Sequence, residues 1–131
     1  MAISKVTLDT GADSGNYIGR SFVQKLPDVR LNKCQHDVRL GDGKTQVNID
    51  TSVTLTLQMQ RLDDRLTAPM LLHFYVVDKL GDEAIIGAPS LMSTCLDYFI
   101  EVLESITGRD SAKTDKLVAD LQRLFLKSIQ K

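Results

Sequence analysis

A long alternation of apolar and polar residues in the middle of the chain constrains the fold more than any other feature. A period of two places one set of side chains on a single face of a strand. Gly41, Asp42 and Gly43 precede the alternation and are turn-forming residues, so we expect a hairpin that leads into a long strand. A sheet is therefore the expected framework of the chain. The alternating apolar residues are Val47, Ile49, Val53, Leu55, Leu57 and Met59.

Shorter patterns add further elements. Alternation over residues 3–8 predicts a strand, and the apolar run Met70–Val77 predicts a buried strand. Apolar residues at helical spacing over residues 18–26 predict a short helix that ends before Pro27. The charged residues 61–65 predict a solvated turn.

The C-terminal third has helical periodicity. From Pro89, a favoured first helical residue, apolar residues keep this spacing until Gly108, which predicts one long helix. A second amphipathic helix is expected after Ser111, with Leu117 and Leu121 on one stripe. We therefore divide the chain into a domain over residues 1–108 and a helical tail over residues 109–131. The tail either packs on its own domain or joins a dimeric helical interface, and the sequence leaves both open.

Size and composition restrict the functional classes. A chain of 131 residues fits one domain, and its net charge of -1 gives no general attraction to nucleic acid or acidic lipid. Because the chain has no secretory signal and no apolar run that could span a bilayer, we expect no membrane partner and a cytoplasmic location. Cys34 and Cys95 lack paired spacing and are expected to be free thiols. His36 and His73 are equally isolated, so neither a metal nor a cofactor is expected.

One carboxylate stands in a distinctive setting. The strand that contains Val6 and Leu8 runs directly into Asp9. Thr10 offers a hydroxyl beside this carboxylate, and Gly11 permits a sharp turn that brings main-chain amides close to it. Taken alone, an apolar strand that ends in an Asp and Gly turn is a common structural device.

Three elements in sequence order resemble retropepsin-like aspartic proteases, and most closely the proteases of long-terminal-repeat retrotransposons. The first is the loop over residues 9–12, which resembles the catalytic loop. The second is the glycine-bearing hairpin over residues 40–44, which resembles the mobile flap that closes over substrate. The third is Ile85, Ile86 and Gly87, which matches the apolar pair and glycine that pack behind the catalytic loop.

The resemblance implies a mainly β, single-lobed acid-protease fold with long C-terminal helices. The chain is too short for two lobes, so the implied enzyme is a homodimer with one catalytic Asp9 per subunit. It would be an endopeptidase that cleaves a retroelement polyprotein, with retroelement particles as one cytoplasmic setting and with no cofactor. The implied active-site loop residues are Thr10, Gly11 and Ala12. The implied substrate-binding residues are Asp13, Gly41, Asp42, Gly43, Ile85 and Ile86.

Two departures from the family pattern keep other interpretations open. Only eight residues precede Asp9, where the family has additional strands, and helices replace the usual C-terminal interface strand. One alternative is a noncatalytic retropepsin-like domain that serves dimerisation or peptide binding. Another is an unrelated β-rich interaction module with a helical tail, in which all three motifs are ordinary turns.

Overall fold

The structure is a computed structural model that describes Ile3, residues 5–12, 14–39, 46–61 and 63–106, and Lys116. Six strands and three α-helices lie within this part of the chain, together with a short 3-10 helix, η1. In chain order the elements are β1 (Lys5–Asp9), β2 (Asn16–Gly19), α1 (Arg20–Gln24), β3 (Leu31–Arg39), β4 (Gln46–Leu57), β5 (Met70–Val77), η1 (Asp78–Leu80), β6 (Glu83–Gly87), α2 (Ala88–Leu91) and α3 (Leu96–Ile106).

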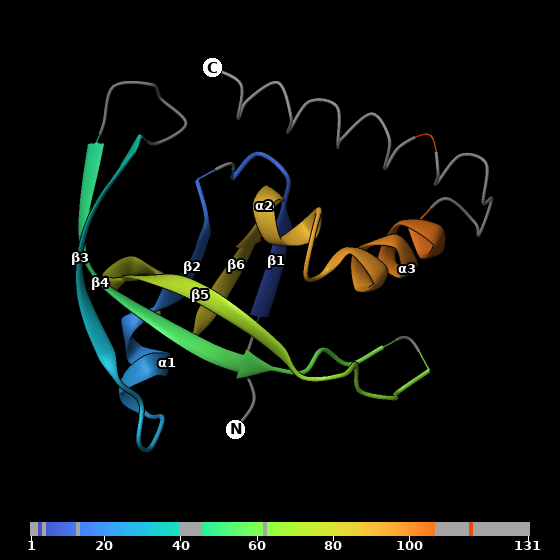
Figure 1. Cartoon of the computed structure of the whole chain (residues 1–131), viewed down its shortest axis with the longest axis horizontal. Coiled ribbons are helices and arrows are strands. Elements are labelled where there is room, and N and C mark those ends of the chain that lie inside the picture. Colours follow the sequence, from blue (N-terminus) through green and yellow to red (C-terminus); the bar gives the residue numbers. More distant parts are fainter. Residues whose placement is uncertain are drawn as a thin grey trace.

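The six strands form one mixed sheet with the order β1-β6-β2-β5-β4-β3, so the chain is mainly β as expected (Figure 1). β1 runs parallel to β6 and β2 runs parallel to β5, whereas the other neighbours are antiparallel. In the register of β1 with β6, Asp9 lies opposite Gly87. The parallel pairing therefore brings the ends of the first and last strands together.

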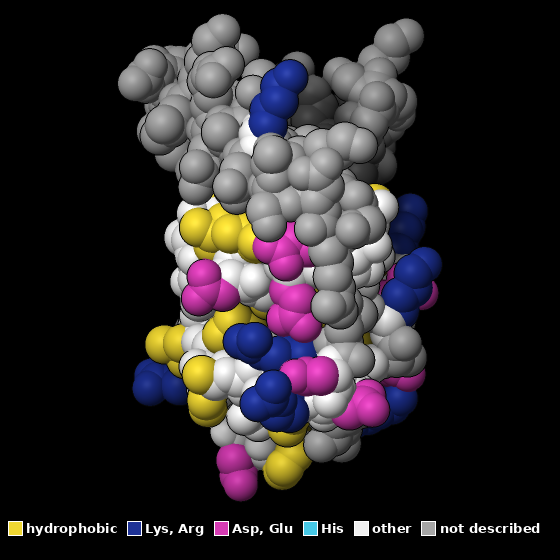
Figure 2. All heavy atoms as spheres, turned by 90° about the vertical axis from the view of Figure 1, so that its right-hand side faces the viewer, with side chains coloured by type: hydrophobic (Ala, Val, Ile, Leu, Met, Phe, Trp, Pro, Cys, Tyr) yellow, Lys and Arg dark blue, Asp and Glu magenta, His cyan; other side chains and the backbone are white. Residues whose placement is uncertain are grey.

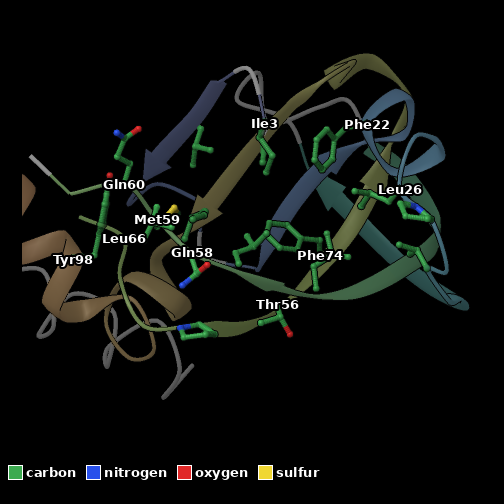
Figure 3. A pocket seen from close by; sticks show the side chains of 18 residues that line it. Ile3, Phe22, Leu26, Thr56, Gln58, Met59, Gln60, Leu66, Phe74 and Tyr98 are labelled. Carbon is green, nitrogen blue, oxygen red and sulfur yellow. The ribbon is translucent and has the colours of Figure 1, made fainter. Parts of the chain in front are cut away.

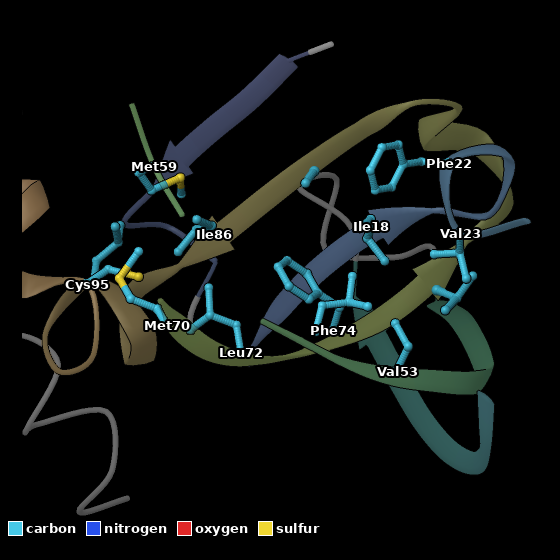
Figure 4. Close-up of a cluster of buried hydrophobic side chains, with 14 of the residues drawn as sticks. Ile18, Phe22, Val23, Val53, Met59, Met70, Leu72, Phe74, Ile86 and Cys95 are labelled. Atoms are coloured by element: carbon cyan, nitrogen blue, oxygen red, sulfur yellow. The ribbon is translucent and has the colours of Figure 1, made fainter. Parts of the chain in front are cut away.

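β5 contributes to the core with every second residue. Met70, Leu72, Phe74 and Val76 are buried, whereas Leu71 between them is 67% exposed. The predicted bounds of this strand are confirmed, but only one of its faces is buried. Figure 4 shows the buried face packed against side chains from β2, β4, β6 and the helices, which is where the main hydrophobic cluster lies.

The helix predicted over residues 18–26 is wrong in its first part. Residues 16–19 form β2, and α1 has only five residues. Ile18 is fully buried as a strand residue, whereas Phe22 and Val23 are buried from the helix. β2 and α1 follow each other and both bury apolar residues in the same core, so these residues recur at a spacing that also fits a single amphipathic helix.

The single long helix predicted from Pro89 is also wrong, because the chain forms α2 and α3 instead. The Ser93 hydroxyl donates a hydrogen bond to the Pro89 carbonyl oxygen (2.6 Å), and the Cys95 N–H donates one to the Ser90 carbonyl oxygen (2.8 Å). The backbone N–H groups of Ser93 and Cys95 both bond to the Ser90 carbonyl oxygen, three and five residues back, so the series of bonds four residues back is interrupted and the helix ends and restarts. The predicted tail helix lies outside the described residues except for Lys116.

The charged turn over residues 61–65 is confirmed by hydrogen bonds between the backbones of Arg61, Asp64 and Arg65. The backbone N–H and the guanidinium of Arg65 lower the pKa of the exposed Asp63 carboxyl. Arg61 also pairs with Glu101 of α3 (3.5 Å). Figure 2, which views the side of the molecule where α3 lies, shows acidic and basic side chains interspersed with apolar ones. Within the described residues, no helix is long and apolar enough to cross a membrane.

Candidate active site

Asp9 ends β1 and begins a tight turn that folds back on its own carboxylate. The Gly11 N–H donates a hydrogen bond to Asp9 Oδ1 (2.9 Å), and the Ala12 N–H donates to the Asp9 carbonyl oxygen (3.1 Å). A Cβ at position 11 would lie 3.2 Å from Asp9 Oδ1, so any larger residue would crowd the carboxylate. The predicted role of Gly11 in bringing a main-chain amide to this carboxylate is therefore confirmed.

The loop over residues 9–12 lies at the surface. Asp9 and Ala12 are half-buried, whereas Thr10 and Gly11 are exposed. The carboxylate is thus held by its own turn on one side and is open to other molecules on the other. A carboxylate in this position can accept hydrogen bonds and exchange protons with a bound ligand or a second chain.

Gly87 and Ala88 support the loop from behind. The Ala88 N–H donates a hydrogen bond to the Ala12 carbonyl oxygen (2.9 Å). Gly87 is buried, and a Cβ at this position would overlap the carbonyl oxygens of Ala12 and Gly15. A glycine is needed here because two backbone segments approach each other more closely than a side chain allows.

The predicted pair Ile85 and Ile86 divides into two roles. Ile86 lies beside Leu8 in the sheet register and is 0% exposed. It therefore cannot contact a substrate directly, contrary to the prediction from the sequence. It supports the loop by packing in the core. Ile85 is half-buried and lies opposite Thr7, so it does present side-chain surface. The remaining predicted substrate-binding residues lie outside the described part of the chain: Asp13, Gly41, Asp42 and Gly43.

Asn16, the first residue of β2, is a site residue that the sequence analysis missed. The residue is 4% exposed, and its side-chain oxygen accepts a hydrogen bond from the Gly87 N–H (2.9 Å). It also donates to the His73 carbonyl oxygen (3.0 Å) and to the Ser90 hydroxyl (2.8 Å). The only available signal was a polar residue directly before the apolar positions of a strand, which is also typical of a loop.

An aromatic cluster borders the far end of the loop. The hydroxyls of Ser14 and Tyr17 hydrogen-bond to each other, and the Tyr75 ring lies so close to Gly15 that a Cβ there would approach it to 2.9 Å. The His36 ring stacks on Tyr75 with ring centroids 3.7 Å apart. His36 and His73 therefore lie in the sheet near this cluster, where His73 meets Tyr75 edge-on.

A separate apolar groove of about 810 Å³ opens beside β1 and β6. Figure 3 shows Phe22 and Leu26 toward one end and Gln60, Leu66 and Tyr98 toward the other, with Ile3 and Phe74 between them. Val6 and Ile86 line the groove, whereas the loop over residues 9–12 does not. Because Ile86 pairs with Leu8, the groove reaches the residue before Asp9 but does not include the loop.

Neither cysteine nor histidine chemistry is assembled at this site. Among the described residues, Cys34 and Cys95 are free thiols, and no group of three or more potential ligand side chains could hold a metal ion. Burial raises the pKa of the Cys95 thiol. No protein-family model, curated protein or solved structure matches this chain.

Proposed function

We propose that the chain is a retropepsin-like aspartic endopeptidase that acts as a homodimer and cleaves a retroelement polyprotein. The observation that carries the proposal is the Asp9 carboxylate, held by the Gly11 amide on an exposed turn that packs against Gly87 and Ala88. One chain supplies one such carboxylate, so a second copy is needed to complete a catalytic pair.

In this mechanism the two Asp9 side chains meet at a twofold axis and share one proton, because two carboxylates a few ångströms apart do not ionise together easily. The ionised member removes a proton from a water molecule that attacks the peptide carbonyl. The protonated member donates a hydrogen bond to the carbonyl oxygen and stabilises the tetrahedral intermediate. The reaction uses only these two carboxylates and water.

Three features of the chain support this role. Thr10 and Gly11 are exposed, so a second copy can approach the loop. The main chain holds Asp9 from its own side, which leaves the outward side of the carboxylate for a partner or substrate. Ile85, half-buried opposite Thr7 in β1, supplies apolar surface for a substrate side chain.

The decisive experiment is an assay of the purified chain against a peptide library with and without pepstatin, combined with the substitution Asp9→Asn. This change keeps the shape of the side chain but removes its ability to exchange the shared proton. We expect pepstatin-sensitive cleavage in the parent chain and a loss of at least about 10³-fold in kcat for the variant, as is typical when a member of a catalytic unit is removed.

Asp28→Asn is the matched control. Asp28 is exposed and has a left-handed backbone (φ 56°), a conformation that Asn also tolerates, so this variant should cleave like the parent chain. A folded dimer that cleaves no peptide would instead support the noncatalytic dimerisation or peptide-binding domain. A strict monomer at high concentration, measured by native mass spectrometry, would support an unrelated interaction module.

A further inference from the structure

The side chain of Asn16 joins three elements beneath the Asp9 loop. Its amide oxygen accepts a hydrogen bond from the N–H of Gly87, the last residue of β6. Its amide nitrogen donates to the His73 carbonyl oxygen in β5 and to the Ser90 hydroxyl in α2. A neutral amide is well suited to this position, because it offers an acceptor and two donors in one buried group.

The segment that Asn16 holds is the one on which the loop rests. Gly87 lies directly opposite Asp9 in the register of β1 with β6, and its neighbour Ala88 donates to the Ala12 carbonyl oxygen. The start and the end of the loop thus both contact residues 87–88. A displacement of this segment would therefore be transmitted to Asp9 at one end and to Ala12 at the other.

We propose that Asn16 is a positioning residue for Asp9, and that it fixes the catalytic loop within each single chain before two chains associate. The inference rests on the proposed protease function and deepens it. Dimer formation then contributes the second carboxylate but does not have to shape the loop. Because Asn16 is buried and touches no substrate, its loss should reduce kcat and leave KM almost unchanged.

The substitution Asn16→Asp tests this proposal through pH. A protonated carboxyl has nearly the shape of the amide and can donate to the His73 carbonyl oxygen or to the Ser90 hydroxyl. The ionised carboxylate cannot donate, and it would lie against the His73 carbonyl oxygen. Burial and this contact should raise the pKa of the new carboxyl in the folded chain above its unfolded value of about 3.9. The correct geometry is therefore present at low pH and is lost as the pH rises through the raised pKa.

We expect the ratio of variant to parent kcat to be close to one near pH 4 and to fall by about tenfold to a hundredfold by pH 7, with less than about a twofold change in KM. Circular dichroism at both pH values establishes that the variant is folded. A folded variant whose kcat ratio does not change with pH, or whose KM alone changes, would overturn the proposal.

Ser90→Ala is a milder second variant if Asn16→Asp does not fold. It removes one of the three hydrogen-bond partners of Asn16, so a smaller fall in kcat is expected with KM unchanged, and equal kcat and stability would contradict the proposal.

If the parent chain itself shows no cleavage, the proposed function fails. The positioning role is then read from the NMR amide signals of Gly11 and Ala12. Relative to the parent, Asn16→Asp should shift both signals more at pH 7 than at pH 4, and equal spectra would overturn it.

Discussion

The β1 and β6 pair is packed in two different ways along its length. At the end that contains Asp9 and Gly87, backbone segments touch so closely that no Cβ fits at Gly87. Up to that end, Val6, Ala84 and Ile86 border an apolar groove of about 810 Å³. The same two strands thus combine a closely fitted end, which holds the candidate catalytic group, with a longer part that leaves space beside the core.

Adding one carbon at the closely fitted end should have the largest effect on this comparison. In Gly87→Ala the new methyl group would overlap the carbonyl oxygens of Ala12 and Gly15, so both segments must move. We expect a loss of about 2 to 3 kcal/mol in the free energy of unfolding, measured by urea denaturation. Gly11→Ala is the control, because a Cβ there would meet only a side-chain atom, Asp9 Oδ1, at 3.2 Å. It should lose about 0.5 kcal/mol, and equal losses would contradict a close fit at Gly87.

Adding one carbon at the groove should have the opposite sign. Val6→Ile keeps the β-branched shape and directs one further methylene toward the groove that Val6 lines. Burial of that group should increase the free energy of unfolding by up to about 0.8 kcal/mol. The same urea titration measures it. A loss of stability would mean that the groove does not accept even one methylene group, and the contrast between the two parts would fail.

The smallest expected effect concerns the reaction rates of the two thiols, which report on how tightly the core around Cys95 is packed. The Cys95 N–H donates a hydrogen bond to the Ser90 carbonyl oxygen, and burial raises the pKa of the Cys95 thiol above its ordinary value. Since the thiolate is the reactive form, Cys95 should react with iodoacetamide at pH 8 much more slowly than the half-buried Cys34. Equal rates, measured by mass spectrometry, would show that this part of the core opens readily.

The same shift predicts how stability depends on alkaline pH. The unfolded chain loses its Cys95 proton at a lower pH than the folded chain, because the folded pKa is the higher one. The contribution of this thiol to stability is therefore complete below about pH 9 and decreases as the pH rises above it. Cys95→Ala should remove this dependence, although it will also reduce the overall stability by creating a cavity.

The strands of the sheet were the most predictable part of the fold. The apolar run placed β5 correctly, and alternation placed β4 to within a few residues because a half-buried strand has a period of two. The break between α2 and α3 could not be predicted from the same kind of pattern. It depends on hydrogen bonds of Ser93 and Cys95 to particular carbonyl groups, which leave the apolar spacing unchanged.

The candidate site divides in the same way. The turn at Asp9 and its support by Gly87 follow from local residue types, because a carboxylate and a glycine have direct signatures in the sequence. The role of Asn16 has no such signature, since its three partners lie on other elements. The burial of Ile86 was also beyond the pattern, because adjacent strand residues face opposite sides and the sequence does not say which of the two faces the core.

The pairing of β1 with β6 also determines when the site can form. The hydrogen bonds of Asn16 with Gly87 and Ser90 join residues 71 and 74 positions apart in the chain. During synthesis the residues around Asp9 leave the ribosome well before residues 87–90, which support them. Contacts of such long sequence separation form late in folding. The position of β6 therefore delays the support of the Asp9 loop until residues 87–90 have been made, so that a shorter nascent chain carries the carboxylate without its native surroundings.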